Sequence, residues 1–414
     1  MNIQKRQPEV NIGMVGHVDH GKTTLTYKLT GTWTDTHSEE MRRGITIKLG
    51  YANMDIYKCE NCPEPEAYTN KPVCPKCNSE AKYLRSVSFV DAPGHESLMA
   101  VMLSGAALMD GAILVIAANE PCPKPQTKEH LMALRILGIE NIIVVQNKID
   151  VVSKERAKEN YKEILRFLEQ FHVHDVPIIP LSAQHDANID ALIQAIEDFI
   201  PTPKRDPKKP PVAYIVRSFD VNKPGTPVKS LVGGILGGTL KQGVLRVGDE
   251  IEIRPGVKIE EGRKTHWEPL YTEITSLTSG NMPLEEARPG GLIGIGTKLD
   301  PSLTKADAMI GNVVGKPDQL PPTLHTLELE IHLFDHVIGL SQEVKVKPLQ
   351  IREPLMITAN TAVSLGYVRS VKRDYAEIIL TRPVVCQEGD RVAIGRRIAE
   401  RWRLIGYGVV KGGS

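Results

Sequence analysis

Residues 16–23 constrain this chain most, because their sequence GHVDHGKT matches the phosphate-binding pattern G-x-x-x-x-G-K-[ST]. The apolar run VNIGMV precedes them and a helical pattern follows, which is the strand, loop and helix context that the pattern requires. Glycines let backbone N–H groups wrap a phosphate, and the start of a helix adds a positive dipole end. Lys22 is expected to reach the outer phosphates, and Thr23 to offer its hydroxyl to magnesium. The sequence therefore predicts a nucleotide site.

A second segment, DAPG, ends the strand-like run SVSFV and supplies Asp91 and Gly94. In a parallel sheet the Asp91 carboxylate would emerge at the carboxyl edge, beside the phosphate loop, where it can hold magnesium through water. Gly94 can give its backbone N–H to the terminal phosphate, and its missing side chain would let the loop move when that phosphate leaves. We therefore expect DAPG to respond to the third phosphate.

A third segment predicts which nucleotide base the site binds. Asn147, Lys148 and Asp150 follow the strand-like run NIIVVQ. Guanine presents an N1–H and an amine side by side, and a carboxylate can accept both, so we expect Asp150 to select guanine. Adenine would leave the Asp150 carboxylate unpaired, so this site excludes a metabolic ATPase. Asn147 is expected to brace the loop and the base, and Lys148 to lay its stem along the ring. Ser182 and Ala183, after the run VPIIPL, are placed to offer backbone N–H groups to the guanine oxygen.

Between residues 10 and 200, short apolar runs alternate with helical patterns. The runs are VNIGMVG, SVSFVDAPG, GAILVIAAN, NIIVVQNKID and VPIIPLSA. This alternation predicts an α/β domain with a mostly parallel sheet and flanking helices. Residues 153–171 have helical periodicity, with Ser153 as the N-cap, and are expected to form an outer helix.

The pattern changes after residues 201–211, PTPKRDPKKPP, which cannot continue a helix and read as a semi-rigid linker. Beyond them, β-branched runs punctuated by glycine and proline predict β-barrels, with a second break at 315–322. The predicted domains are a GTP-binding domain over 1–203 and barrels over 204–322 and 323–414.

The overall charge excludes a global basic field, because 51 lysines and arginines oppose 50 acidic residues, a formal net charge of +1. Nothing indicates a DNA-binding protein, and any RNA contact must be a local patch. No stretch of 18 apolar residues and no signal-peptide pattern is seen, so we expect a cytoplasmic protein without a membrane partner. Cys122 and Cys386 stand alone and are expected to behave as small, partly buried hydrophobic residues.

The other four cysteines, Cys59, Cys62, Cys74 and Cys77, form CENC and CPKC with eleven residues between them. Four thiolates at this spacing make a closed tetrahedral zinc site. Two disulfides, or free thiols, are the alternatives. With all four positions filled by sulfur, zinc would be structural and would pin an insertion over about 57–80 rather than catalyse a reaction.

Together these segments resemble the translational GTPases, the group of elongation factor Tu, the selenocysteine-specific elongation factor and initiation factor 2 gamma. The elements GHVDHGKT, RGITI, DxPGH, NKxD and SA occur in the family's order. The segments GITIKLGYANMDIY, QTKEH, RSFDVNKPG and GGLIGIGTKLDP, with the two CxxC pairs, look like the gamma subunits of eukaryotic and archaeal initiation factor 2. The likeness spans nearly the whole chain, and its compact form and intact VDHGKT favour an archaeal member.

The resemblance implies further roles. Thr46 would be the first-switch threonine that binds magnesium when the third phosphate is present, although Arg42 and Arg43 replace the acidic residue usual in elongation factors nearby. His95 would orient the attacking water, and Ile45, with Val18, would form an apolar gate. No arginine finger is recognised, so intrinsic hydrolysis should be slow. The nucleotide site would also include His17, Val18, Asp19, His20, Gly21, Thr24 and Gln184.

Asp19 is an unusual charge beside an anion. It could carry a second magnesium, or it could be a solvated loop carboxylate, and the sequence does not separate the two. The departure at Arg42 and Arg43 does not affect the role expected of Thr46.

The function implied by the resemblance is a GTPase that binds methionylated initiator tRNA in its GTP state. It would carry this tRNA to the small ribosomal subunit, with alpha and beta subunits as partners, and hydrolysis to GDP would release it. An elongation-type or selenocysteine-specific tRNA carrier is the first alternative. A subunit that uses GTP only as a structural ligand is the second.

Overall fold

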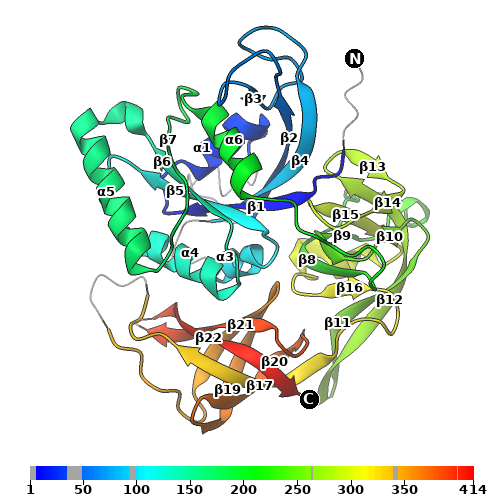
Figure 1. Ribbon diagram of the computed structural model, residues 1–414. Helices are drawn as coiled ribbons and strands as arrows, with labels where there is room; N and C mark the ends of the chain where they lie inside the picture. Colours follow the sequence, from blue (N-terminus) through cyan, green and yellow to red (C-terminus); the bar gives the residue numbers. More distant parts are fainter. Residues whose placement is uncertain (1–5, 35–48, 94–98, 263, 339–343, 399) are drawn as a thin grey trace. The chain divides into compact units, whose positions relative to one another are not determined.

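The computed structural model describes residues 6–34, 49–93, 99–262, 264–338, 344–398 and 400–414 (Figure 1). The chain divides into two compact units. One contains Pro8–Pro203, and the other contains Lys204–Val337 and Val344–Ser414. No helix in the described ranges is both long and apolar enough to span a membrane.

The first unit contains a seven-stranded sheet in the order β3-β2-β4-β1-β5-β6-β7. The strands are β1 (Val10–Gly16), β2 (Gly50–Lys58), β3 (Tyr68–Thr69), β4 (Lys82–Asp91), β5 (Gly111–Ala117), β6 (Ile142–Asn147) and β7 (Ile178–Pro180). All neighbouring pairs from β4 to β7 in this order are parallel, whereas β2 pairs antiparallel with both β3 and β4. The predicted mostly parallel α/β sheet is confirmed.

Helices cover both faces of this sheet. They are α1 (Lys22–Thr30), α3 (Met99–Ala106), α4 (Pro125–Ile136), α5 (Lys154–Gln170) and α6 (Ile189–Phe199), with a short 3-10 helix η2 (Ile149–Val151). In Figure 1, α1 and α6 lie on one side of the sheet and α3 and α4 on the other. Buried side chains of α1 and α6 share one apolar core with alternate residues of the strands, as a period of two places them on one face.

Helix α5 confirms the sequence prediction for residues 153–171. Its N-cap is Ser153, whose hydroxyl accepts the Arg156 N–H at 3.2 Å. Ile164, Phe167 and Leu168 lie at helical spacing and are buried. The apolar stripe therefore fixes which face of α5 turns towards the sheet.

The strand register brings the three predicted site segments to one edge of the sheet. Met14 of β1 pairs with Asp91 of β4, and Ala117 of β5 pairs with Asn147 of β6. Since these neighbouring strands are parallel, their carboxyl ends lie side by side, and the segments that follow them can form one ligand site.

The second unit contains two β-barrels. The first uses β8 (Val212–Phe219), β9 (Ile235–Gln242), β11 (Glu250–Glu261), β12 (Lys264–Ser279), β15 (Ile293–Thr297) and β16 (Val313–Gly315), and it closes because β11 pairs with both β16 and β12. Shorter elements are β10 (Leu245–Arg246), β13 (Met282–Leu284), β14 (Glu286–Ala287), η3 (Val228–Ser230) and η4 (Pro301–Asp307).

The second barrel is closed in the order β17-β20-β19-β18-β21-β22. Its strands are β17 (Thr323–Leu333), β18 (Pro354–Ala359), β19 (Ala362–Lys372), β20 (Tyr375–Val385), β21 (Arg391–Ile398) and β22 (Arg401–Gly413). Two predicted barrels are thus present. Residues 201–211 contain neither helix nor strand. Cys386 is buried and Cys122 is partly buried, as expected of small hydrophobic residues.

Candidate nucleotide site

The phosphate loop needs glycine at two positions. Gly16 has φ 137°, and a Cβ there would lie 2.3 Å from the carbonyl oxygen of Val115. Gly21 has φ 89°, and a Cβ there would lie 2.4 Å from Nδ2 of Asn147. The loop therefore approaches both β5 and the end of β6 more closely than a side chain at these glycines would permit.

Lys22 opens α1, and its ammonium lies within the phosphate loop. Its Nζ donates to the carbonyl oxygen of Gly16 at 3.1 Å and to that of His17 at 2.8 Å. Only 6% of the residue is exposed. A buried ammonium needs such acceptors, and a phosphate in the loop would be a stronger one because it is charged.

Two hydroxyl groups meet the Asp91 carboxylate at the end of β4. Oδ2 of Asp91 accepts the hydroxyl of Thr23 at 2.9 Å and that of Thr34 at 2.7 Å. Asp91 has no exposed surface. Magnesium prefers hard oxygen ligands, so Thr23 and Asp91 form a fitting donor set. Thr34 was not predicted, since no motif marks it.

Two buried histidines, His130 and His20, hold the phosphate loop through hydrogen bonds to the backbone. The Gly16 N–H donates to Nδ1 of His130 at 2.8 Å. Nδ1 of His20 lies 3.1 Å from the Val115 carbonyl oxygen, which can only accept, so this nitrogen carries the proton. Burial lowers the pKa of His130 to about 3 and that of His20 to about 4. The QTKEH segment contains His130, but its contact with Gly16 could not be read from the sequence.

The pH dependence of stability follows from these shifts. His130 has a folded pKa of about 3 against 6.5 ordinarily, so the unfolded chain binds its proton first. Its contribution is complete above pH 6.5 and declines as the pH falls towards 3, by up to about 1.4 kcal/mol per pH unit. We expect His130→Gln to lower the thermal midpoint at pH 7 and to make its fall between pH 7 and pH 5 shallower.

The matched control is His174→Gln, since His174 is exposed. Differential scanning calorimetry of the unaltered chain and the two variants at both pH values would measure six midpoints, and His174→Gln should keep the pH slope of the unaltered chain. A pH slope in His130→Gln as steep as in the unaltered chain would contradict the assignment of a neutral, buried His130.

Asn147 connects three segments at the predicted base site. Its Nδ2 donates to the His20 carbonyl oxygen at 2.9 Å, and its Oδ1 accepts the Ala183 N–H at 3.1 Å. All three residues are buried. The side chain thus ties the phosphate loop to the loop after β7, as a residue that braces the site would.

Asp150 lies in η2, close to that same loop. A hydrogen bond from the Ser182 hydroxyl lowers the pKa of Asp150, against the smaller opposing effect of burial. His185 adds positive potential when protonated, since its Nε2 lies 3.6 Å from Oδ2 of Asp150. The carboxylate is therefore ionised at neutral pH, which is the form that accepts both guanine donors.

The backbone donors of the loop after β7 already have acceptors. The Ser182 N–H donates to the Ala187 carbonyl oxygen at 3.3 Å, and the Ala183 N–H donates to Asn147. Donation from either group to the guanine oxygen would require it to share or exchange its acceptor, so that role stays a prediction. Gln184, next in the loop, is exposed.

Four predicted residues lie outside the described parts of the chain. They are Ile45 and Thr46 of the first switch, and Gly94 and His95 of the second. Val18 and Thr24 are partly buried, and Asp19 is exposed with φ 62°. Within the described residues, Asp19 belongs to no group of metal-ligating side chains, and its second-metal role stays open.

The four-cysteine cluster forms a second candidate site. The sulfur atoms of Cys59, Cys62, Cys74 and Cys77 all lie within 4.8 Å of one another. The Sγ atoms of Cys59 and Cys77 are 3.4 Å apart, and those of Cys62 and Cys74 are 3.7 Å apart, well beyond a disulfide bond. All four are free thiols. This geometry suits one tetrahedral metal ion.

Local backbone bonds shape this cysteine cluster. The Cys74 N–H donates to the Ser79 carbonyl oxygen and the Asn78 N–H to the Cys74 carbonyl oxygen, in a tight turn with Asn78 at φ 57°. The cluster follows β2, whose other end, Gly50, pairs with Asp91. A nine-residue strand spans about 30 Å, so the cysteines lie at the sheet edge opposite the phosphate loop.

Family models match three parts of the chain. Residues 7–202 match the Elongation factor Tu GTP binding domain, residues 233–315 match Elongation factor Tu domain 2, and residues 325–410 match Initiation factor eIF2 gamma, C terminal. With a phosphate loop, an ionised base-site carboxylate and two following barrels, the chain is a GTP-binding protein of the translational GTPase class.

Comparison with curated relatives shows which family within this class the chain belongs to. The chain is 61% identical to translation initiation factor 2 subunit gamma of Pyrococcus abyssi (strain GE5 / Orsay), over 99% of this chain and 98% of that protein. It is 60% identical to the protein of the same name from Methanocaldococcus jannaschii, over 99% of both. The chain belongs to the translation initiation factor 2 subunit gamma family.

Solved structures of related factors share the fold. A bacterial selenocysteine-specific elongation factor superposes with a TM-score of 0.73 at 23% identity, over 97% of this chain and 58% of that one. Elongation factor SelB from Methanococcus maripaludis gives 0.72 at 22% identity, over 99% of this chain and 80% of that one. At this identity the likeness concerns architecture alone, so the archaeal gamma-subunit relatives decide between initiation and the selenocysteine alternative.

Proposed function

We propose that this chain, in its GTP state, binds methionylated initiator tRNA and delivers it to the small ribosomal subunit, and that hydrolysis to GDP releases the tRNA. The observation that carries this proposal is membership of the initiation factor 2 gamma family over the full chain. The converging loops at the carboxyl edge of the sheet supply the nucleotide site that such a cycle needs.

In this proposal each part of the site has one task. The phosphate loop and Lys22 bind the phosphates, and Asp150 selects guanine. Thr23, Asp91 and Thr46 hold magnesium, which, when bound, neutralises charge that develops on the phosphates. Asp19 is the candidate ligand for a second magnesium ion.

Hydrolysis is proposed to depend on the two switch segments. His95 orients the attacking water, the Gly94 N–H binds the third phosphate, and Val18 with Ile45 excludes other water. A partner or the ribosome completes the site, since the sequence offers no arginine finger. Loss of the third phosphate would then release both segments and change the tRNA surface.

We also propose the partners and the division of the chain. Alpha and beta subunits bind the first barrel and the GTP-binding domain, respectively, in the cytoplasm. The domains are residues 1–203, 204–322 and 323–414. Both barrels lie in one compact unit, so the boundary between them rests on the break at residues 315–322.

Filter binding tests the proposed tRNA delivery. Initiator and elongator methionyl-tRNA would each be titrated with this chain and its alpha partner, loaded with GDP or a non-hydrolysable GTP analogue. Tight binding that requires the analogue and prefers the initiator supports the proposal. Equal binding of both tRNAs indicates an elongation-type carrier, and no binding in either state rejects tRNA delivery but leaves GTP binding intact.

GTP turnover with and without ribosomes tests the remaining alternative. A catalytic switch is expected to hydrolyse GTP slowly alone and much faster with small subunits and partners. Equal, negligible turnover under both conditions would instead indicate that GTP is a structural ligand.

We further propose that the cysteine cluster holds zinc. The four sulfur atoms leave no position open for water, so the ion would be structural. Its expected task is to hold the turn around Asn78 and the end of β2, which have only a small apolar core of their own.

Zinc removal has a predictable and separable effect. In Cys62→Ser/Cys74→Ser, the zinc content measured by plasma mass spectrometry should fall from about one ion per chain to nearly none. GDP affinity should change less than about twofold, because about 30 Å of strand separates the cluster from the phosphate loop. Cys122→Ser is the control and should keep its zinc; a metal-free unaltered chain would reject the zinc proposal.

A further inference from the structure

The loop over residues 118–123, between β5 and α4, contacts both halves of the nucleotide site. The Ala118 N–H donates to the carbonyl oxygen of Asn147 at 2.8 Å. Oε2 of Glu120 lies 2.9 Å from Nζ of Lys124 and 3.7 Å from Nε2 of His20 in the phosphate loop; the second is a packing contact and not an ion pair, because the neutral imidazole carries its proton on Nδ1. A shift of this loop would therefore disturb the base site and the phosphate loop together.

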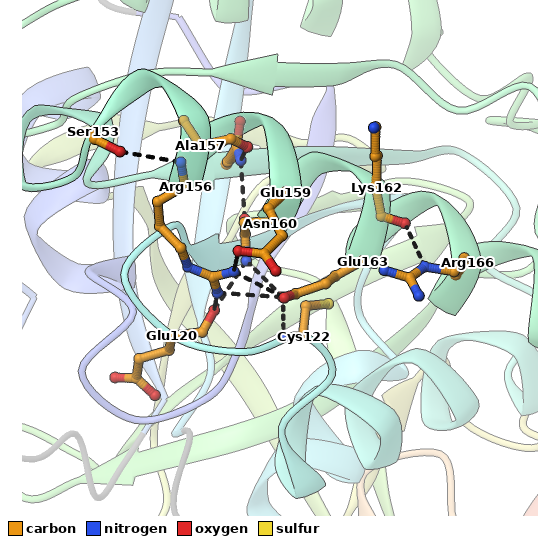
Figure 2. A network of polar contacts seen from close by, with 11 residues as sticks. Glu120, Cys122, Ser153, Arg156, Ala157, Glu159, Asn160, Lys162, Glu163 and Arg166 are labelled. Atoms are coloured by element: carbon orange, nitrogen blue, oxygen red, sulfur yellow. Dashed lines mark hydrogen bonds and ion pairs between the residues drawn. The ribbon is translucent and has the colours of Figure 1, made fainter.

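Three side chains of α5 hold this loop by its backbone (Figure 2). Arg156, Asn160 and Glu163 are spaced four and three residues apart, so they share one face of the helix. Nη2 of Arg156 donates to the Glu120 carbonyl oxygen at 2.8 Å, and Nδ2 of Asn160 donates to the same oxygen at 2.9 Å. We refer to these three residues as the α5 clamp.

Glu163 provides the second hold of the α5 clamp. Its Oε2 accepts the Cys122 N–H at 2.8 Å, and its Oε1 accepts Nη1 of Arg156 at 2.8 Å. Burial opposes ionisation of Glu163, but the bonds from Arg156 and Cys122 outweigh it and lower the pKa of this carboxyl. The loop is thus fixed at two points, two residues apart, and each point bonds to one charged side chain: Arg156 at the Glu120 carbonyl and Glu163 at the Cys122 N–H.

The α5 clamp also reaches the strand that carries the base site. Nε2 of Gln146 donates to Oδ1 of Asn160 at 2.9 Å and to the Ala157 carbonyl oxygen at 2.7 Å. Asn160 has no exposed surface, and Gln146 directly precedes Asn147. One buried amide therefore joins the end of β6 to the loop that faces His20.

We propose that the α5 clamp positions Glu120 and its loop against His20 of the phosphate loop, and that this arrangement sets how slowly guanine nucleotide leaves the site. The inference rests on the proposed GTP and GDP binding. Arg156, Asn160 and Glu163 are positioning residues, since they act through the loop and not on the nucleotide.

The direction of these bonds supports a positioning role. A surface ion pair within a helix contributes little to stability. In a partly buried ion pair, the attraction between the charges barely offsets the cost of desolvating them. Here the charged groups bond to the backbone of a separate loop, which limits the conformations open to Glu120. A loop held in place packs against His20 and so supports the bonds of His20 to Val115 and Asn147, which hold the phosphate loop to β5 and β6.

The test is the dissociation rate of a fluorescent GDP analogue from the full chain. Arg156→Ala should speed release by about tenfold, and Glu163→Gln, which keeps the shape of the side chain, by several fold. Arg156→Lys should restore part of the slow release, because the ammonium keeps the charge but lacks the planar fork whose two nitrogens bond to the Glu163 carboxylate and the Glu120 carbonyl oxygen. Arg166→Ala is the matched control: Arg166 lies on α5 and bonds only to the carbonyl of its own turn among the contacts of Figure 2.

A double-mutant cycle separates positioning from mere helix stability. If Arg156 acts through the loop, Arg156→Ala should add little to the faster release already caused by Glu120→Ala. Additive effects, an unchanged rate in both Arg156→Ala and Glu163→Gln, or an equal rise in Arg166→Ala would each overturn the proposal. An unaltered chain that binds no GDP would instead reject the proposed nucleotide function.

Discussion

Asp150→Asn is expected to weaken GDP binding by about a thousandfold or more and to create measurable binding of xanthosine diphosphate. An ionised carboxylate accepts the guanine N1–H and amine together, and the bond from the Ser182 hydroxyl lowers the pKa of Asp150, which favours this ionised form. Asparagine offers one acceptor and one donor, so its NH₂ would face the guanine amine, donor against donor. Xanthine carries an oxygen in place of that amine and can accept this NH₂.

Competition titrations with GDP, XDP and ADP on one preparation would measure this change of base preference. Asp198→Asn is a suitable control, since Asp198 is exposed on α6, and its GDP affinity should stay within about twofold of the unaltered chain. If Asp150→Asn bound GDP normally, Asp150 would not be the residue that reads the base. Equal loss of GDP and XDP binding would indicate a collapsed loop instead of a changed preference.

Much of the fold could be predicted because its signals are local. The buried runs of β1 and β5 lack the alternation of an exposed strand, which is typical of a parallel sheet covered on both faces. Ser153 and the apolar spacing of α5 specify its start and its buried face within a few residues of chain. The run that contains β2 is strand-like in sequence, but its antiparallel pairing with β3 and β4 could not be predicted, because it depends on the path of the intervening chain.

The parts of the site that could not be predicted depend on contacts between distant segments. His130 meets Gly16 across 114 residues of sequence, and Thr34 meets Asp91 across 57. Neither contact leaves a pattern in the neighbouring residues. The same holds for the α5 clamp, since an arginine, an asparagine and a glutamate on a polar helix face read as solvated groups until the loop that they bind is placed beside them.

Lys22→Ala is expected to weaken GDP binding by at least about a hundredfold while changing the stability of the nucleotide-free chain little. The phosphates would lose a charged donor in a sheltered loop, where such bonds are strong. In the nucleotide-free chain, by contrast, burying the ammonium carries a desolvation cost, which bonds such as those to the carbonyls of Gly16 and His17 offset. Function and stability therefore separate at this residue.

Thermal unfolding with increasing GDP measures that separation directly, because a ligand at free concentration L that binds only the folded state stabilises it by RT ln(1 + L/Kd), so tighter binding raises the midpoint further. Both chains should gain stability with GDP, but at saturating GDP Lys22→Ala should gain about 2.7 kcal/mol less, which is RT ln 100 for a hundredfold loss of affinity, although their midpoints without GDP agree within a few degrees. Lys28→Ala is the matched control on α1, where Lys28 pairs with Asp186, and should keep the full GDP response. A Lys22→Ala chain that keeps the response would show that the helix N-terminus and the loop backbone bind the phosphates without this ammonium. A chain that fails to fold would show instead that the ammonium holds the loop together through Gly16 and His17.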